Sequence, residues 1–416
     1  MFNWQCGDEL IRALWDLDPS ITFLNHGSYG AVPRDVQRTQ QDIMREIERN
    51  PVDFLSRRLP EKLACQRTRL AQWLNMDADG CAFVSNATAG VGSVLTSLSF
   101  KAGDEIVFHS HGYGWVRQAL QNLSKRSGVK IREAQIPWPT QYRQESKIEQ
   151  KLSEDIILEA FDRELSPLTK LVICDHMTSP TALILPVRKI VQMARVKGIP
   201  ILVDGAHAPG LVALDLQQID ADFYTGNLHK WVCAPRGAAF LAVKSQWRDL
   251  LRPESLSYSG GVTHHAYDQS FAGYFDWTGT RDYSAWLSIG SALDFNEKLN
   301  WGELFQKRNA LLSQARARIA EALKLEQSTL PESQFCAAMG TLEWPLLENI
   351  KPDSGLAREL SCELLEKHKV EVPVICIGNR LHVRISAQAY NRFEDYERLI
   401  EVLVAHRFSA ARIGEG

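Results

Sequence analysis

The sequence lacks the features that would point to a disulfide scaffold, a zinc site, a membrane protein or a nucleic-acid-binding protein. Its eight cysteines lie at positions 6, 65, 81, 174, 233, 336, 362 and 376 and form no Cys-x-x-Cys pair. No apolar run approaches the length of a membrane span, and the first residues, Met1-Phe2-Asn3-Trp4, lack the pattern of a signal peptide. The net charge of −3 offers no basic surplus for nucleic acid. We therefore expect a cytoplasmic protein with reduced, mostly buried thiols and with neither a membrane nor a nucleic acid as a partner.

Internal repeats, low-complexity segments and linker-like runs are also missing. With 416 residues the chain can bury a large core, and two domains are the natural expectation. Hydrophobic residues make up 45% and charged residues 23% of the sequence, which are ordinary proportions for a globular protein. The fold class therefore has to be read from the order of the helix and strand patterns.

Strand and helix patterns alternate in the longer, N-terminal part of the chain. We predict buried strands at 81–85, 105–109, 171–175, 200–203 and 238–243, and helices after Pro33 and at 86–98, 145–165 and 186–197. Residues 252–275 show no clear element. From about 283 the pattern changes to helices at 283–299, 302–324, 353–368 and 392–406 and strands at 339–344, 371–376 and 380–385. We expect a large α/β domain over 20–282 and a small α+β domain over 283–416, which an N-terminal arm at 1–19 joins.

Asp204 and Lys230 lie at the ends of two successive strand patterns, 26 positions apart. A lysine amine can form a Schiff base with pyridoxal phosphate (PLP), and a carboxylate can hold the pyridine nitrogen protonated so that the ring acts as an electron sink. A single lysine after a strand is more often a solvated surface residue. Here His229 and Trp231 flank the lysine, and Pro235-Arg236-Gly237 follows it. We therefore predict that Asp204 and Lys230 belong to a PLP site.

Four sequence blocks carry a resemblance to a known family. They are Phe23-Leu-Asn-His-Gly-Ser-Tyr-Gly-Ala-Val-Pro33, Asp175-His-Met-Thr-Ser-Pro-Thr-Ala182, Val203-Asp-Gly-Ala-His-Ala-Pro-Gly210 and Tyr224-Thr-Gly-Asn-Leu-His-Lys-Trp231. In this order they resemble the class V aminotransferases of PLP fold type I, which are related to cysteine desulfurases, and within them the isopenicillin N epimerase-like branch. The resemblance implies a large domain with a mostly parallel seven-stranded sheet and a smaller α+β C-terminal domain. It also implies PLP as the cofactor.

Several residues become candidates for the cofactor site. The helix start after 81–85 is a possible phosphate site, because free amides and the helix dipole favour an anion. By resemblance, His111 or Tyr113 stacks on the pyridine ring, and Thr178 or Ser179 stands where desulfurases carry an asparagine near the phenolic oxygen. His207 replaces the glutamine of many relatives. The full set of expected cofactor residues is Ala87, Thr88, His111, Tyr113, Thr178, Ser179, Asp204, His207, Asn227, His229, Lys230 and Thr280.

The resemblance also implies which residues meet the substrate and which carry the chemistry. Lys230, Asp204 and His207 are the expected catalytic residues. Arg384 is the expected anchor of an amino-acid carboxylate, which a guanidinium holds in a bidentate fork, and the loop residues Asn25, His26 and Gly27 are expected to line the substrate pocket. In the resembling dimers the loop that contains Thr280 reaches the phosphate of the neighbouring subunit, so we expect a homodimer with shared active sites.

The reaction remains open at the sequence level. The family chemistry runs from an aldimine of the amino acid to an α-carbanion, after which epimerisation, β-elimination of a sulfur group or transamination are possible. We name an epimerase-like enzyme first and a C–S lyase on an S-substituted cysteine, an aminotransferase or a cysteine desulfurase as alternatives. A desulfurase needs a mobile cysteine, and Cys336 has apolar neighbours. A PLP-fold binding or regulatory protein is the non-enzyme alternative. We expect no metal site, although His264 and His265 form a pair.

Overall fold

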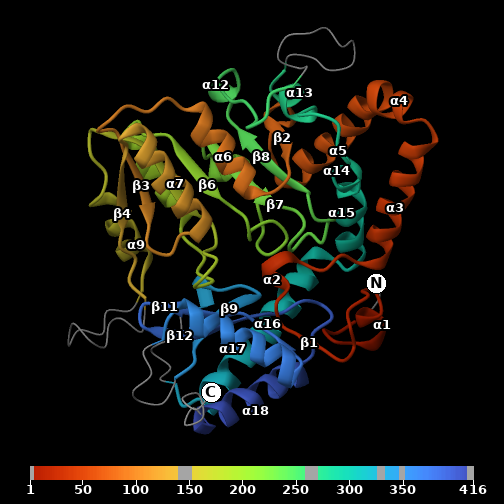
Figure 1. The fold of residues 1–416 in the computed structure, drawn as a ribbon, viewed down its shortest axis with the longest axis vertical. Helices are drawn as coiled ribbons and strands as arrows, with labels where there is room; N and C mark the ends of the chain where they lie inside the picture. Colours follow the sequence, from red (N-terminus) through yellow and green to blue (C-terminus); the bar gives the residue numbers. More distant parts are fainter. Residues whose placement is uncertain (1–3, 139–151, 258–269, 326–332, 346–351, 410–416) are drawn as a thin grey trace.

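The structure is a computed structural model, and it describes residues 4–138, 152–257, 270–325, 333–345 and 352–409. Figure 1 shows the large domain in the upper part of the view and the small domain, with its blue C-terminal helices, below it. The short helix α2 (His26–Tyr29) lies between the two. No helix among the described residues is long and apolar enough to cross a membrane. The pair His264–His265 falls outside the described residues.

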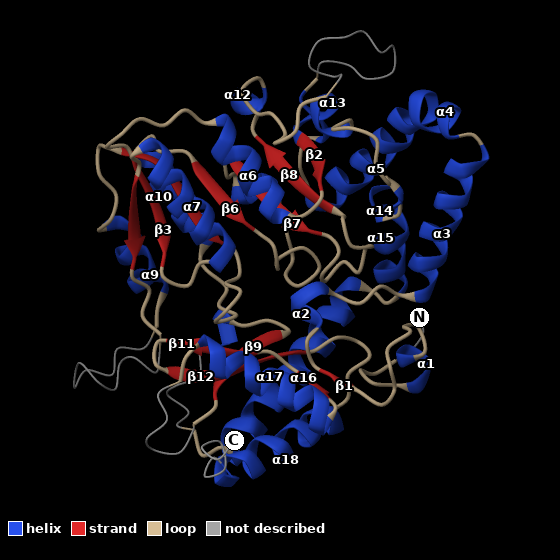
Figure 2. Cartoon of the chain, in the orientation of Figure 1, coloured by secondary structure: helices blue, strands red, loops and turns tan. Residues whose placement is uncertain are grey.

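A seven-stranded sheet forms the centre of the large domain (Figure 2). Its order is β2-β8-β7-β6-β5-β3-β4, and only β8 runs antiparallel to its neighbours. This confirms the expected mostly parallel sheet. The strands are β2 (Cys81–Val84), β3 (Glu105–His109), β4 (Lys130–Ala134), β5 (Thr169–Asp175), β6 (Ile201–Asp204), β7 (Phe223–Asn227) and β8 (Ala239–Val243).

Helices cover both faces of the sheet, because its strands are apolar on both sides. Neighbouring residues of one strand enter different cores: Val107 packs in the core that contains α10, and Ile106 packs in the core that contains α6 and α7. The helices of this domain are α3 (Arg34–Arg49), α4 (Pro51–Asp53), the π-helix η1 (Phe54–Arg58), α5 (Leu59–Leu74), the 3-10 helix η2 (Ala78–Gly80), α6 (Ala87–Ser97), α7 (Gly114–Ser127), α9 (Glu154–Asp162), α10 (Val187–Val196), α11 (Leu216–Ile219), α12 (Ser245–Arg248) and α13 (Phe271–Asp276).

The small domain contains a three-stranded antiparallel sheet in the order β11-β12-β9, as the strand patterns near the C-terminus led us to expect. These strands are β9 (Met339–Glu343), β11 (Val374–Ile377) and β12 (Arg380–Ser386), and the packed helices are α16 (Trp301–Ala322), α17 (Ser354–His368) and α18 (Phe393–Ser409). A second, parallel pair joins β1 (Thr22–Phe23) to β10 (Val370–Glu371). The 3-10 helix η5 (Ser333–Phe335) precedes β9, and α1 (Glu9–Arg12) lies in the N-terminal arm.

The region after residue 283 packs differently from the expected small domain. α14 (Ser284–Leu287) and α15 (Ile289–Lys298) contact α3 and α5 of the large domain. Their buried residues Trp286 and Leu293 belong to the hydrophobic core that α3 and α5 share with the sheet. On this packing we propose that the domain boundary lies near Asn300, which caps the start of α16, and not at 283.

Candidate active site

A cavity of about 380 Å³ opens where several parallel strands end. In open α/β sheets the carboxyl ends of the strands are the usual place for a ligand. Asp175 ends β5, Asp204 ends β6 and Asn227 ends β7, and all three line this cavity. The other lining residues are Ser28, Tyr29, Ser85, Asn86, Ala87, Thr88, Tyr113, Met177, Ser179, Ala206, His207, His229, Lys230, Arg236 and Gly237. The structure thus brings together most of the residues that the sequence singled out.

Lys230 extends into the cavity from a tightly packed loop. Its Nζ lies 3.1 Å from His207 Nε2. Burial and then the charge of Arg384 lower the pKa of Lys230 to about 7, and burial lowers the pKa of His207 well below its ordinary value. The neutral imidazole can therefore accept a hydrogen bond from the amine at Nε2. Next in the chain, Trp231 is fully buried in the core of the small domain, which fixes the loop that carries the lysine.

Two carboxylates lie side by side at the inner end of the cavity. Asp175 and Asp204 are register partners on β5 and β6. Asp175 Oδ1 lies 3.1 Å from His109 Nε2, whereas Asp204 Oδ1 accepts the amide hydrogen of Ala206 at 2.9 Å. Burial, followed by the charge of Asp175, raises the pKa of Asp204 to about 7. A buried carboxylate in this position is stabilised by a cation, which a protonated pyridine nitrogen would supply.

The N-terminus of α6 forms another wall. Asn86 caps the helix through the Ala89 amide at 2.9 Å, and the Ala87 amide donates to Asn227 Oδ1 at 2.8 Å. Among the described residues neither the amide nor the hydroxyl of Thr88 has a hydrogen-bond partner, so both are free to meet a phosphate. Arg236 lines the same cavity and makes no ion pair within the described part of the chain. We did not single out Arg236 from the sequence, although its place in Pro235-Arg236-Gly237 beside Lys230 was visible there.

Arg384, on β12 of the small domain, lies directly behind two serines that line the cavity. Its Nη1 donates to the carbonyl oxygen of Ser179 at 2.8 Å and to Ser179 Oγ at 3.1 Å, and its Nη2 donates to Ser28 Oγ at 2.9 Å. The guanidinium is buried, which lowers its pKa to about 10. A substrate carboxylate at Arg384 would compete with these serine oxygens. Ser28 was absent from our sequence expectations.

His26 does not line the cavity, and we propose that it positions the lysine loop in place of the expected contact with the substrate. The ring is fully buried. His26 Nδ1 lies 2.9 Å from the Tyr390 hydroxyl and Nε2 lies 3.0 Å from the Lys230 carbonyl oxygen. It therefore ties the backbone of Lys230 to the small domain. The exposed residue Tyr29, which sequence reasoning missed, lines the cavity.

The two other loop candidates also lie beside the cavity and not in its wall. Gly27 is buried at a point where an added Cβ would lie 2.6 Å from Met339 Sδ. The side-chain amide of Asn25 donates to Glu371 at 2.9 Å, and its Oδ1 accepts from the Ser28 hydroxyl at 2.6 Å. Both residues therefore support the lining residues of α2.

His111 and Tyr113, the two candidates for stacking on the pyridine ring, have different surroundings. Both nitrogens of His111 are used: Nδ1 lies 2.8 Å from Thr181 Oγ1 and Nε2 lies 2.8 Å from the Ile136 carbonyl oxygen. His111 is buried outside the cavity lining, whereas Tyr113 lines it. We therefore propose that Tyr113, and not His111, lies over the pyridine ring. The sequence held no signal for this, because Thr181 and Ile136 lie far from His111 in the chain.

Of the remaining candidates for the cofactor site, Ser179 and His229 line the cavity, whereas Thr178 and Thr280 do not. Ser179 lines the cavity, but Thr178 is fully buried, where its hydroxyl lies 2.7 Å from Thr181 Oγ1 and accepts the amide hydrogen of Leu183 at 2.8 Å. His229 lines the cavity, with Nδ1 3.3 Å from the Ala238 carbonyl oxygen. Thr280 is exposed and lies outside the lining of this cavity.

The residues present fit PLP. Lys230 would supply the amine, and Asp204 is a buried carboxylate that forms no ion pair within the described part of the chain. Thr88 and Arg236 could meet a phosphate, and Tyr113 could supply an aromatic ring. No part of this donor set conflicts with the cofactor that the sequence resemblance implies.

Solved structures share the fold. A cystine C–S lyase in complex with cysteine persulfide superposes with a TM-score of 0.74 at 20% identity and covers 93% of this chain and 98% of its own. A cysteine desulfurase from Thermococcus onnurineus gives a TM-score of 0.76 at 17% identity and covers 97% of this chain and 99% of its own. These similarities confirm the expected PLP fold type I.

Curated relatives extend the comparison to the sequence. An isopenicillin N epimerase from Amycolatopsis lactamdurans is 31% identical over 93% of this chain and 95% of its own length. A probable chloroplastic L-cysteine desulfhydrase from Arabidopsis thaliana is 30% identical over 96% of this chain and 86% of its own. The family model described as aminotransferase class V matches residues 31–399. These comparisons confirm the expected PLP cofactor and the expected enzyme class, without the specific reaction. The chain belongs to the class V aminotransferase family.

Proposed function

We propose that this chain removes the α-proton of an amino acid and then expels a sulfur group from its β-carbon, which makes it a C–S lyase. One observation supports this reaction over epimerisation. Epimerisation needs a second acid–base group on the far face of the substrate, and of the three candidates His26, His111 and Tyr113 the two histidines do not line the cavity. Elimination needs only one base, and Lys230 with a pKa of about 7 suits that task near neutral pH.

Four residues of the active site have separate parts in the proposed reaction. Bound PLP supplies the electron sink that makes the Cα–H bond acidic. Asp204 holds the pyridine nitrogen protonated, and Arg384 holds the substrate carboxylate. Lys230 takes the proton from Cα, while His207 accepts a hydrogen bond from the amine and so orients it. The sulfur leaves from Cβ with the bonding electrons.

The cavity favours a small substrate. Its volume of about 380 Å³ is at the lower end of the range for small-molecule sites, about 300 to 1,000 Å³, and the cofactor would fill much of it. None of the eight cysteines lines the cavity, and burial raises the pKa of Cys336. A desulfurase mechanism with a cysteine nucleophile is therefore not supported. No disulfide is formed among the described residues, which agrees with a cytoplasmic location.

Epimerisation is the second candidate. The relatives from Amycolatopsis lactamdurans and Streptomyces clavuligerus are named isopenicillin N epimerases, and Tyr113 lines the cavity with a hydroxyl that could protonate Cα from the other face. Burial raises the pKa of Tyr113, which keeps the hydroxyl protonated.

The experiment uses the holoenzyme in heavy water with L-amino acids and S-substituted L-cysteines. We expect pyruvate and ammonia from the S-substituted cysteines and little loss of chirality in unreacted substrate. Loss of chirality with α-deuterium incorporation and no 2-oxo acid would establish an epimerase. Tyr113→Phe keeps the ring and removes the hydroxyl, so it should spare elimination and abolish epimerisation if that hydroxyl is the second acid.

We also propose that two chains form a homodimer with shared active sites. Thr280 is exposed on the connection between α13 and α14, where a neighbouring subunit can reach it. This proposal rests on the family resemblance for the role of Thr280.

A further inference from the structure

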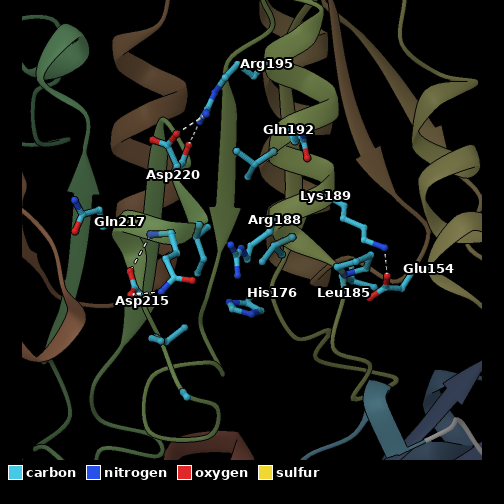
Figure 3. A pocket seen from close by; sticks show the side chains of 17 residues that line it. Glu154, His176, Leu185, Arg188, Lys189, Gln192, Arg195, Asp215, Gln217 and Asp220 are labelled. Carbon is cyan, nitrogen blue, oxygen red and sulfur yellow. Dashed lines mark hydrogen bonds and ion pairs between the residues drawn. The ribbon is translucent and has the colours of Figure 1, made fainter.

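A second cavity, separate from the active site, lies between α10 and α11. It has a volume of about 920 Å³ and is lined by both helices, by the segment that follows β5 and by Glu154 of α9 (Figure 3). It shares no lining residue with the PLP cavity. The reaction proposed above makes no use of it.

His176 offers a hydrogen-bond donor to this cavity. The residue is 8% exposed and lines the cavity, and its Nδ1 lies 2.8 Å from the Tyr224 hydroxyl. Burial raises the pKa of Tyr224 well above its ordinary value, so the hydroxyl keeps its proton. Within the described residues the hydroxyl contacts no hydrogen-bond acceptor other than His176, to which it donates. Nδ1 is therefore the acceptor, and Nε2 carries the hydrogen. Nε2 has no partner among the described residues.

The cavity lining contains three acids and three cations. Two of the acids form ion pairs with cations of α10: Glu154 pairs with Lys189, and Asp220 pairs with Arg195. The third, Asp215, caps α11 by accepting the Gln218 amide at 2.8 Å; this hydrogen bond and, to a smaller extent, the charge of Arg188 lower its pKa. Arg188 projects from the first turn of α10, where the helix dipole adds positive potential. Within the described ranges Arg188 makes no ion pair.

We propose that the cavity between α10 and α11 is a second ligand site, which binds a small metabolite through a carboxylate or phosphate group held by Arg188 and His176. A guanidinium and an imidazole N–H are suitable donors for either oxyanion. The amide of Gln192, another lining residue, can contact the remainder of the ligand.

The position of His176 connects this site to the catalytic carboxylates. His176 directly follows Asp175, and its backbone amide donates to the Asp204 carbonyl oxygen at 2.8 Å. The ring of Tyr224 fills the space beside Gly205, where an added Cβ would lie 2.4 Å from it. A ligand on His176 therefore acts on the strand ends that hold Asp175 and Asp204, and we expect it to change the turnover of the enzyme.

The test is isothermal titration of the holoenzyme with inorganic phosphate and, separately, with succinate, because bound PLP already fills the other phosphate site. We expect saturable binding of at least one of the two anions, at one site per chain. Arg188→Gln should weaken this binding about tenfold or more, as for loss of a charged hydrogen bond. Lys189→Gln is the matched control, because Lys189 lines the same cavity but is neutralised by Glu154.

The proposal is overturned if neither anion binds, if Arg188→Gln leaves binding unchanged, or if both variants weaken it equally. The two arms also separate the ligand classes: phosphate alone points to a phosphorylated metabolite, and succinate alone to a carboxylic acid. Binding is measured without turnover, so its result does not depend on whether the enzyme is a lyase.

Discussion

At the scale of single residues, the chemistry of the site depends on two buried ionisable side chains, Lys230 and Asp204, whose pKa values burial shifts towards neutrality. Lys230 and Asp204 both have a pKa of about 7, the lysine because burial disfavours its ammonium and the aspartate because burial disfavours its carboxylate. A lysine near neutrality can act as a base at the pH of the cell. An aspartate whose pKa is near 7 becomes fully charged when the positive charge of a pyridinium lies against it.

Asp204→Asn should leave PLP bound but remove most of the activity. A buried charge that loses its partner costs about 3 to 5 kcal/mol, which corresponds to roughly two to four orders of magnitude in rate. The measurement is kcat with the best substrate, together with the absorption spectrum to confirm that the cofactor is present. Asp175→Asn is the matched control, since it changes the register partner of Asp204 on β5. An equal loss in both variants would contradict a specific role for Asp204.

The residues that sequence reasoning placed well are those whose role depends on the strand ends. Asp204, Asn227 and Lys230 follow recognisable strands, and parallel strands bring their carboxyl ends together. His26 and His111 were placed less well because a ring can turn to either side of a loop. Their direction depends on Tyr390 and Thr181, which lie far away in the sequence.

At the scale of elements, the segment around α2 holds the lysine loop in place. His26 contacts the Lys230 carbonyl oxygen, and Gly30 lies so close to the same loop that an added Cβ would be 2.1 Å from the His229 carbonyl oxygen. Gly30 also has a φ of 69°, a conformation that favours glycine. The segment and the loop can therefore be expected to shift together.

Gly30→Ala should reduce both stability and PLP affinity. Gly198→Ala is the control, because Gly198 has a similar φ of 68° but an added Cβ there meets nothing within 4 Å. The control should lower the free energy of unfolding by about 1 to 2 kcal/mol, the penalty for an alanine in the left-handed conformation. Gly30→Ala should lower it further, because its Cβ must also displace the Lys230 loop. Denaturant unfolding and PLP titration measure the two effects. Equal losses in the two variants would argue against the close contact.

The sequence predicted several helices and strands to within a few residues, but it missed one interruption of a strand and one helix. β5, α10 and α17 were predicted to within a few residues. The expected strand at 371–376 is instead two strands, β10 and β11, because Pro373 cannot donate a backbone hydrogen bond. We missed α7, although Val116, Leu120 and Leu123 follow a helical spacing and are buried.

At the scale of the whole molecule, a set of buried neutral histidines predicts sensitivity to acid. Burial lowers the pKa of His26 and His109 to about 3, and that of His111, His176, His229 and His382 to about 4. Between pH 6.5 and 4 the unfolded chain binds protons that the folded chain does not, so the free energy of unfolding falls as the pH falls. Each histidine contributes up to about 1.4 kcal/mol per pH unit.

Asp175 and Asp204 oppose this trend, because their raised pKa values favour the folded state in the same window. They are two groups against the six histidines above and His207, whose pKa burial also lowers, so we expect the melting temperature to drop steeply from pH 6.5 to pH 4. Calorimetry in buffers of constant ionic strength measures it. A melting temperature that is flat or rising over this range would contradict the buried neutral histidines.

The proposed shared active site makes the homodimer testable through Thr280. If its hydroxyl meets the phosphate bound by the neighbouring chain, Thr280→Val should weaken PLP binding roughly 10- to 100-fold, the range for a hydrogen bond to a charged group. PLP titration and light scattering give affinity and mass in solution. A monomeric wild-type protein with full activity would rule out the shared site, and Ser284→Ala, a buried position on α14, controls for general damage.

The central claim is that Lys230 is the residue that holds PLP, and its most direct measurement is borohydride reduction of the holoenzyme followed by mass spectrometry of the peptides. We predict a phosphopyridoxyl group on the peptide that contains Lys230 and none on that peptide in Lys230→Ala. A label on another lysine, or a wild-type protein that takes up no PLP, would contradict the account.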